Sequence, residues 1–200
     1  MDRFPLRLMI AAALAVLPTV APAQRMSESY EFLKAVREAD GNKVTEFLNQ
    51  PGSRIVDAKD RDTGDTALHI VTRRSDTTYM RFLMSRGANV NSQDAKGNTA
   101  LMIAVSSGCG ECADLLITAH ANVNLANGSG ETPLIRAVQV RNLALASTLL
   151  TAGANPDQND VIAGMSARDY AKRDARSPAI TKLLNDAPKA SARGVSGPRL

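Results

Sequence analysis

Four glycines at nearly constant spacing divide most of this chain into units of equal length. Gly64, Gly97, Gly130 and Gly164 are separated by 33, 33 and 34 residues. The six-residue segments that begin at the first three read Gly-Asp-Thr-Ala-Leu-His, Gly-Asn-Thr-Ala-Leu-Met and Gly-Glu-Thr-Pro-Leu-Ile. A fixed period of this length indicates a repeat protein, in which each unit packs mainly on its two neighbours.

A second motif recurs in phase with the first. It reads Arg-Gly-Ala-Asn-Val-Asn at 86–91, Ala-His-Ala-Asn-Val-Asn at 119–124 and Ala-Gly-Ala-Asn-Pro-Asp at 152–157. Two motifs in phase over three copies do not arise from composition. The fourth copy of the first motif, Gly-Met-Ser-Ala-Arg-Asp at 164–169, is degenerate.

From about Ser27 to Asn185 the chain resembles the ankyrin-repeat family. The family pattern is Gly-x-Thr-Pro-Leu-His, then a helix pair, then Gly-Ala-x-x-Asn. The resemblance implies an all-α solenoid of stacked helix pairs with short β-hairpin-like fingers. One closing glycine is replaced by His120, a residue type that the left-handed backbone region tolerates comparatively well.

The motifs also make physical sense as helix signals. Thr66, Thr99 and Thr132 stand just before apolar residues at helical spacing, which predicts three N-caps, and Pro133 suits a first helical position. Aromatic residues make up 4% of the chain and Trp is absent, so we expect a core of small aliphatic side chains between closely packed helices. A helix pair cannot bury its apolar face alone, and stacking makes one continuous core.

Both ends of the array read as caps, giving about five repeats in all. Residues 32–39 and 43–48 predict a helix pair that no finger precedes, and residues 177–184 predict a last helix. Arg168 replaces the apolar Leu of the first motif. We expect it to face water, because only an outermost repeat has an exposed end face.

The chain begins with the three parts of a secretory signal peptide. Arg3 and Arg7 precede a ten-residue apolar run, and Ala21-Pro22-Ala23 supplies a small-x-small cleavage site. The run is half of what a membrane span needs, at about 20 residues. We therefore expect removal of residues 1–23 and a soluble protein in the periplasm or secreted, with an ankyrin-repeat domain at 24–185 and a flexible basic tail at 186–200.

Enzyme and nucleic-acid signatures are missing from the sequence. There is no Gly-x4-Gly-Lys, Gly-x-Ser-x-Gly or His-Glu-x-x-His motif. The 24 cationic and 20 anionic residues are spread along the chain without a run of five Lys or Arg. His69 fills a family position that orders the turn by hydrogen bonding. We expect no catalysis, no cofactor, no metal and no nucleic-acid partner.

Cys109 and Cys112 form a Cys-x-x-Cys pair at the start of a predicted helix. By the repeat register Cys109 lies in the turn between paired helices, and Cys112 takes an apolar position of the second helix. Three interpretations stay open: a local disulfide favoured by export, a small buried side chain beside a free thiol, and a working redox switch or metal site.

The resemblance implies a protein partner, bound by the finger tips and the first helices. By register, the exposed positions are Asp62, Thr63, Asp65, Arg73, Arg74, Ala95, Lys96, Asn98, Ser106, Ser107, Gly128, Ser129, Glu131, Gln139 and Val140. They lack the Tyr and Trp anchors of tight interfaces, so we expect moderate affinity. Our leading hypothesis is a monomeric, non-catalytic periplasmic adaptor, accessory or inhibitor protein. The alternative is a thiol redox sensor that uses Cys109 and Cys112.

Overall fold

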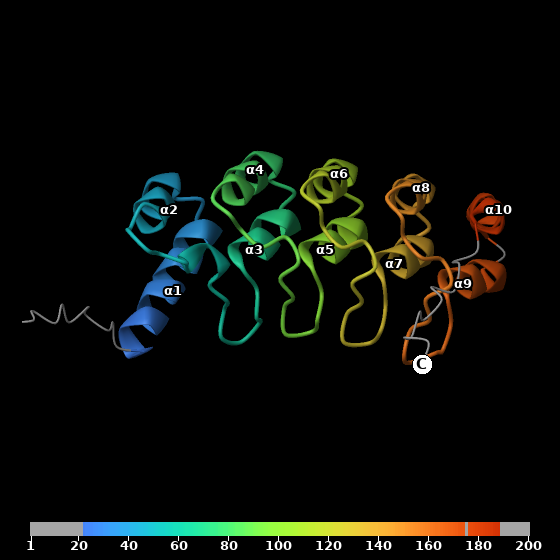
Figure 1. The fold of residues 1–200 in the computed structure, drawn as a ribbon, viewed down its shortest axis with the longest axis horizontal. Helices are drawn as coiled ribbons and strands as arrows, with labels where there is room; N and C mark the ends of the chain where they lie inside the picture. The colour runs from blue at the N-terminus through green and yellow to red at the C-terminus, as the bar shows by residue number, and fades with distance from the viewer. Residues whose placement is uncertain (1–21, 175, 189–200) are drawn as a thin grey trace, which may run out of the picture.

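The computed structural model describes residues 22–174 and 176–188 and shows a row of five stacked helix pairs (Figure 1). The first helices of the pairs are α1 (Pro22–Arg37), α3 (Ala67–Arg73), α5 (Ala100–Ser107), α7 (Pro133–Gln139) and α9 (Ala167–Arg173). The second helices are α2 (Gly41–Leu48), α4 (Thr77–Ser85), α6 (Gly110–Thr118), α8 (Leu143–Thr151) and α10 (Pro178–Asp186), and a short 3-10 helix, η1, spans Ile55–Asp57. The predicted all-α solenoid is confirmed.

The finger loops project from the same side of the array in Figure 1. In the described part of the chain they contain a single isolated bridge, between Gln93 and Thr99, and no regular strand. Of the predicted signal peptide, residues 1–21 lie outside the described residues, and α1 begins at Pro22. None of the described helices is long and apolar enough to cross a membrane.

The predicted N-caps start the first helices. Thr99 and Thr132 accept hydrogen bonds through their Oγ1 atoms from the backbone N–H groups of Met102 and Ile135, at 3.2 and 3.3 Å. Thr66 caps α3 together with His69. These bonds satisfy helix-end donors that would otherwise be buried without partners.

The core is aliphatic and runs through the whole array. Apolar positions of the repeat recur as buried side chains, each at most 1% exposed: Leu68, Leu101 and Leu134 in the first helices, and Leu83, Leu116 and Leu149 in the second. They belong to one continuous cluster of buried residues. Each repeat therefore depends on its neighbours for burial, as the sequence predicted.

Adjacent fingers are joined by one backbone hydrogen bond each. The N–H groups of Ala95, Gly128 and Val161 donate to the carbonyls of Thr63, Lys96 and Ser129, each at 2.9 Å. The contact is so close that a Cβ atom on Gly64, whose φ is +69°, would lie 2.5 Å from the backbone nitrogen of Ala95. The spacing of the glycines thus follows from finger stacking.

The second motif, together with Asp57 ahead of its first copy, forms a ladder between repeats. Side-chain oxygens of Asp57, Asn91 and Asn124 accept hydrogen bonds from the backbone N–H groups of Asn89, Asn122 and Asn155, at 2.8, 2.7 and 2.7 Å. One more period of 33 residues beyond Asn155 reaches Pro188, which has no N–H to donate. The ladder therefore cannot continue in the same way.

Arg168 closes the ladder, and the prediction that it faces water is wrong. Its residue surface is 9% exposed, its Nε donates to Asp157 at 2.7 Å, and its guanidinium also donates to the carbonyls of Leu184, Ala187 and Pro188. The last carbonyls of α10 need donors, which the side chain supplies.

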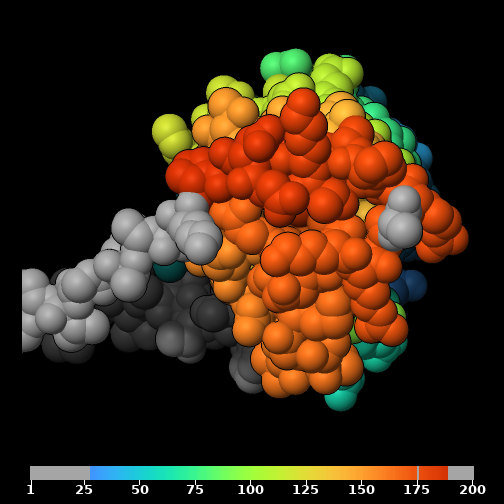
Figure 2. Space-filling view, turned by 90° about the vertical axis from the view of Figure 1, so that its right-hand side faces the viewer, coloured from blue at the N-terminus to red at the C-terminus, as the bar shows by residue number. Residues whose placement is uncertain are grey.

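The folded C-terminal segment extends past the boundary between repeat domain and tail that we predicted after residue 185. Figure 2 shows α9, α10 and the last finger covering this end of the array. The folded part extends through residues 186–188, which we predicted to be tail. Residues 189–200 of that tail lie outside the described part.

Candidate functional site

A groove of about 760 Å³ lies over α5 and α7, between their fingers. It brings together seven of the predicted binding residues: Arg73, Lys96, Asn98, Ser106, Ser107, Ser129 and Glu131. Four further residues line it: Met102, Ile103, Asn127 and Arg136. The residues come from three consecutive repeats, so the groove exists only because the repeats stack.

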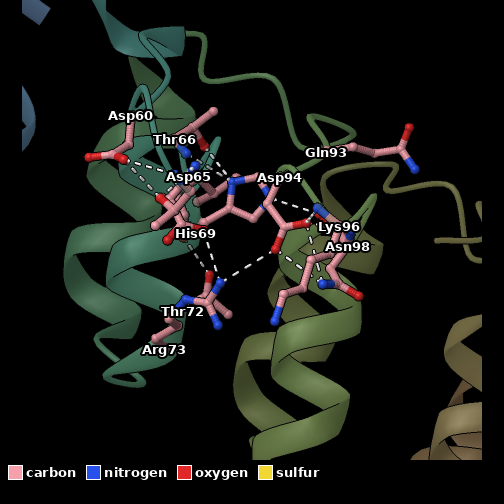
Figure 3. A network of polar contacts seen from close by, with 12 residues as sticks. Asp60, Asp65, Thr66, His69, Thr72, Arg73, Gln93, Asp94, Lys96 and Asn98 are labelled. Carbon is pink, nitrogen blue, oxygen red and sulfur yellow. Dashed lines mark hydrogen bonds and ion pairs between the residues drawn. The ribbon is translucent and has the colours of Figure 1, made fainter. Parts of the chain in front are cut away.

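Behind the groove, His69 links the first full repeat to the next (Figure 3). Its Nδ1 accepts a hydrogen bond from the backbone N–H of Thr66 at 3.1 Å, which places the proton on Nε2. Nε2 then donates to the carbonyl of Asn98 at 3.0 Å. Burial lowers the pKa of His69 below its usual value, so the ring is neutral near pH 7. The predicted turn-ordering role is confirmed, and the link to Asn98 adds a contact between repeats.

Arg73 connects the bases of two fingers. Its Nη2 lies 2.9 Å from Asp65 and 3.5 Å from Asp94 (Figure 3). Burial by itself raises the pKa of Asp94, but hydrogen bonds from Asn98 and Lys96 outweigh burial and hold that pKa below its ordinary value. The Arg73 side chain is half exposed at one edge of the groove, and its charge is compensated by the two carboxylates.

Glu131 and Arg136 make a second charged pair in the groove, 2.6 Å apart. Glu131 Oε2 also accepts a hydrogen bond from Asn127 Nδ2 at 3.3 Å. Within the described residues, Glu131 Oε1 and Arg136 Nε are buried without a hydrogen-bond partner. A buried polar atom without a partner costs free energy, so the rest of the described chain does not fully satisfy this pair.

Two of the predicted surface positions are buried, so the prediction from register that they are exposed is wrong. Asp65 and Glu131 are only 8% and 7% exposed. Each carboxylate sits at the base of a finger and accepts a hydrogen bond from an arginine, Arg73 or Arg136. Register gives the position of a residue in the repeat, but it does not reveal this inward pairing.

The other predicted positions are exposed or half-buried, but not all of them line the groove. Outside its lining lie Asp62, Thr63, Arg74, Ala95, Gly128, Gln139 and Val140. Arg74 is turned toward the N-terminal repeat, where it donates to the carbonyl of Val36 at 2.7 Å and lies over the ring of Tyr79. It therefore supports the stack more than a binding surface.

The sequence held a signal for some of the residues that we missed. Arg136 takes the register position of Ile70 and Ile103, so a charge there departs from the pattern. Val161 and Ile162, at the tip of the last finger, are 79% and 80% exposed. Two adjacent apolar side chains in a loop were a second signal.

The cysteines occupy the positions that the register predicted. Cys109 precedes α6 and is half-buried, whereas Cys112 lies inside α6 and is fully buried. Their sulfur atoms are paired, at 2.03 Å. Among the residues that the structure describes, no three His, Cys, Asp or Glu side chains are grouped to hold a metal ion.

Comparison with protein families agrees with this geometry. A family model described as ankyrin repeats in three copies matches residues 32–127. A model of a single ankyrin repeat matches residues 129–161. Together the matches cover the C-terminal part of α1 and all of α2 to α8.

Proposed function

The chain belongs to the ankyrin-repeat family, and we propose that it is a non-catalytic adaptor that binds a partner protein in the groove over α5 and α7. Ankyrin repeats are in general protein–protein interaction modules. The observation that carries the proposal is the groove itself, which collects seven register-predicted residues from three repeats on a rigid frame.

The groove offers both donors and acceptors to a ligand. The hydroxyls of Ser106 and Ser107 donate to backbone carbonyls at 2.8 and 3.1 Å, which leaves their oxygen lone pairs free to accept. The ammonium of Lys96 is exposed and has no hydrogen-bond or ion-pair partner among the described residues. An extended peptide segment presents N–H and C=O groups alternately, so it matches this mixture.

The charges and exposed apolar side chains of this surface indicate the chemistry of the bound segment. Arg73 and Arg136 are already paired with carboxylates, so Lys96 supplies the uncompensated charge of the groove. We therefore propose a segment with an acidic side chain placed at Lys96, and an apolar contact at Val161 and Ile162 on the last finger tip. Exposed charge pairs set the association rate and selectivity more than the affinity.

The N-terminal pattern supports a location outside the cytoplasm for this activity. The basic start, short apolar run and Ala-x-Ala site support export with removal of residues 1–23. We accordingly propose a periplasmic or secreted protein that acts as a monomeric adaptor, accessory factor or inhibitor of an exported protein.

The test is affinity capture from the exported fraction with quantitative mass spectrometry. Ser106→Arg places a large side chain in the groove, and Ser147→Arg makes the same change on the exposed surface of α8. The proposal predicts a protein that wild type and Ser147→Arg retain equally and that Ser106→Arg loses by at least tenfold. Equal retention by all three would show that the groove is not the binding site.

A further inference from the structure

Four of the five second helices in the described array, all but α10, share one capping device, and the α6 version contains sulfur. In α2, α4 and α8 the residue before the helix is Asp or Asn, and its side-chain oxygen accepts the N–H three residues later. The pairs are Asp40 with Lys43 (3.0 Å), Asp76 with Tyr79 (2.9 Å) and Asn142 with Leu145 (3.0 Å). In α6 the acceptor is Cys109 Sγ and the donor is the N–H of Cys112, at 3.2 Å. Cys109 therefore fills the cap position of the repeat.

This position accommodates negative charge. In two of the three sister repeats, at Asp40 and Asp76, the capping group is a carboxylate. The partial positive charge of a helix N-terminus favours an anion there, and it also lowers the pKa of a thiol. The acidic side chain in the first turn of α6, Glu111, lies 3.6 Å from Arg81, which partly offsets its charge. A Cys109 thiolate would thus replace the aspartate of the sister caps.

The two sulfurs differ in access. Cys112 is fully buried in the core, whereas Cys109 is half-buried and lies between two glycines, Gly108 and Gly110. A Cβ atom added at Gly110 would meet nothing within 4 Å. Cys109 is therefore the more accessible residue of the pair, since it keeps some exposed surface and Cys112 has none.

Backbone hydrogen bonds also hold the start of α6. The N–H of Cys109 donates to the carbonyl of Ala104 at 2.9 Å, and the N–H of Ala113 donates to the carbonyl of Cys109 at 3.1 Å. The disulfide closes a loop of only two intervening residues, so it restricts the unfolded chain little. The turn can keep its backbone geometry when the bond is broken.

We propose that Cys109 and Cys112 form a reversible thiol–disulfide exchange site, with Cys109 as the exchanging residue and helix cap in both states. This activity is independent of the partner-binding groove. The co-reactant is a dithiol. One of its thiolates attacks Cys109 Sγ, the Cys109–Cys112 bond breaks, and the Cys112 sulfur leaves with the bonding electron pair and takes up a proton.

The second step returns the dithiol as a disulfide. The second thiolate of the co-reactant attacks the co-reactant's first sulfur atom, which is bonded to Cys109 in the mixed disulfide. This attack releases Cys109 as a thiolate, which the N–H of Cys112 stabilises. Two electrons have passed from the dithiol to the cysteine pair. The reverse sequence reoxidises the pair.

The first test compares the reactivity of single cysteines in the folded protein. Cys112→Ser leaves only Cys109, and Cys109→Ser leaves only Cys112. The proposal predicts that iodoacetamide alkylates Cys109 at pH 7 at least tenfold faster than Cys112, with a Cys109 pKa below the ordinary thiol value of about 8.5. Equal rates, or a Cys109 pKa above that value, would overturn the assignment of Cys109 as the exchanging residue.

The second test asks whether the folded pair exchanges at all. Wild-type protein is incubated with dithiothreitol in native buffer and in denaturant, thiols are trapped with a maleimide, and folding is followed by circular dichroism. The proposal predicts reduction in native buffer without loss of helix and reoxidation by oxidised glutathione. Reduction that occurs only in denaturant, or that unfolds the protein, would identify a purely structural disulfide.

A matched variant separates capping from redox chemistry. Cys109→Asp with Cys112→Ala copies the oxygen cap of the sister repeats and cannot exchange. It should melt within a few degrees of reduced wild type, because both keep an acceptor at the cap. Cys109→Ala with Cys112→Ala should melt lower, since it has none. Equal melting of the two double variants would contradict the capping role of Cys109.

Discussion

Replacing Arg168 with Ala should destabilise the C-terminal end of the array by about 2–4 kcal/mol. The side chain is buried and donates to Asp157 and to the carbonyls of Leu184, Ala187 and Pro188. A hydrogen bond from a charged group is worth about 1.5–3 kcal/mol. The expected loss of stability is far smaller than the sum for four such bonds. The reason is that the Asp157 side chain is 37% exposed, so water replaces part of the lost hydrogen bonding.

Two variants show whether the hydrogen-bond donors of Arg168 or its side-chain volume stabilise the array. Arg168→Leu restores the family residue and fills the space without donors, so it should recover less than half of the loss. Arg176→Ala is the surface control, because its side chain is 74% exposed and its ion pair with Asp174 is peripheral. It should cost less than about 0.5 kcal/mol.

The assay is urea unfolding by circular dichroism, with hydrogen exchange to localise the effect. Because repeats interact mainly with their neighbours, protection should fall in α9 and α10 and stay unchanged in α3. A loss for Arg168→Ala equal to that for Arg176→Ala would refute the reasoning, and so would full recovery by Arg168→Leu.

Leu116→Ala should cost about 2–5 kcal/mol in urea melts, because Leu116 is fully buried in a central repeat; a loss below 1 kcal/mol would contradict its place in the core. Lowering the pH from 7 to 5 should destabilise the protein, because the pKa of His69 is below its unfolded value and the unfolded state binds more protons in this range. His69→Met, which copies Met102 of the next repeat, should flatten this pH dependence, and an unchanged slope would exclude His69 as its source. Intact mass of the exported protein should show a chain that begins at Gln24, and a full-length cytoplasmic species would contradict export.

The repeat period predicted most of the fold because the same contacts recur in every unit. The threonine caps, the leucine core and the spacing of the glycines all follow from stacking of identical elements. Asn91 and Asn124 show the limit of that argument. Their motif was visible, but its role as a ladder between repeats depends on pairs of residues more than thirty positions apart.

Departures from the repeat were harder to interpret from the sequence. The charge of Arg168 suggested solvent, but its position next to Pro188 and the end of α10 gives it four acceptors within the protein. Asp65 and Glu131 were assigned to the surface by register, and each turns inward because an arginine on the following helix pairs with it. Such pairings depend on side-chain length and direction, which a period does not encode.

Hydrogen–deuterium exchange of the protein with its captured partner tests the central claim most directly. Binding should protect the peptides that contain the finger, α5 and α7 positions of the groove, which are residues 94–107 and 127–136. Peptides from α4, α6 and α8 on the opposite layer should not change. Protection confined to those second helices, with none at residues 94–107 and 127–136, would contradict binding in the groove.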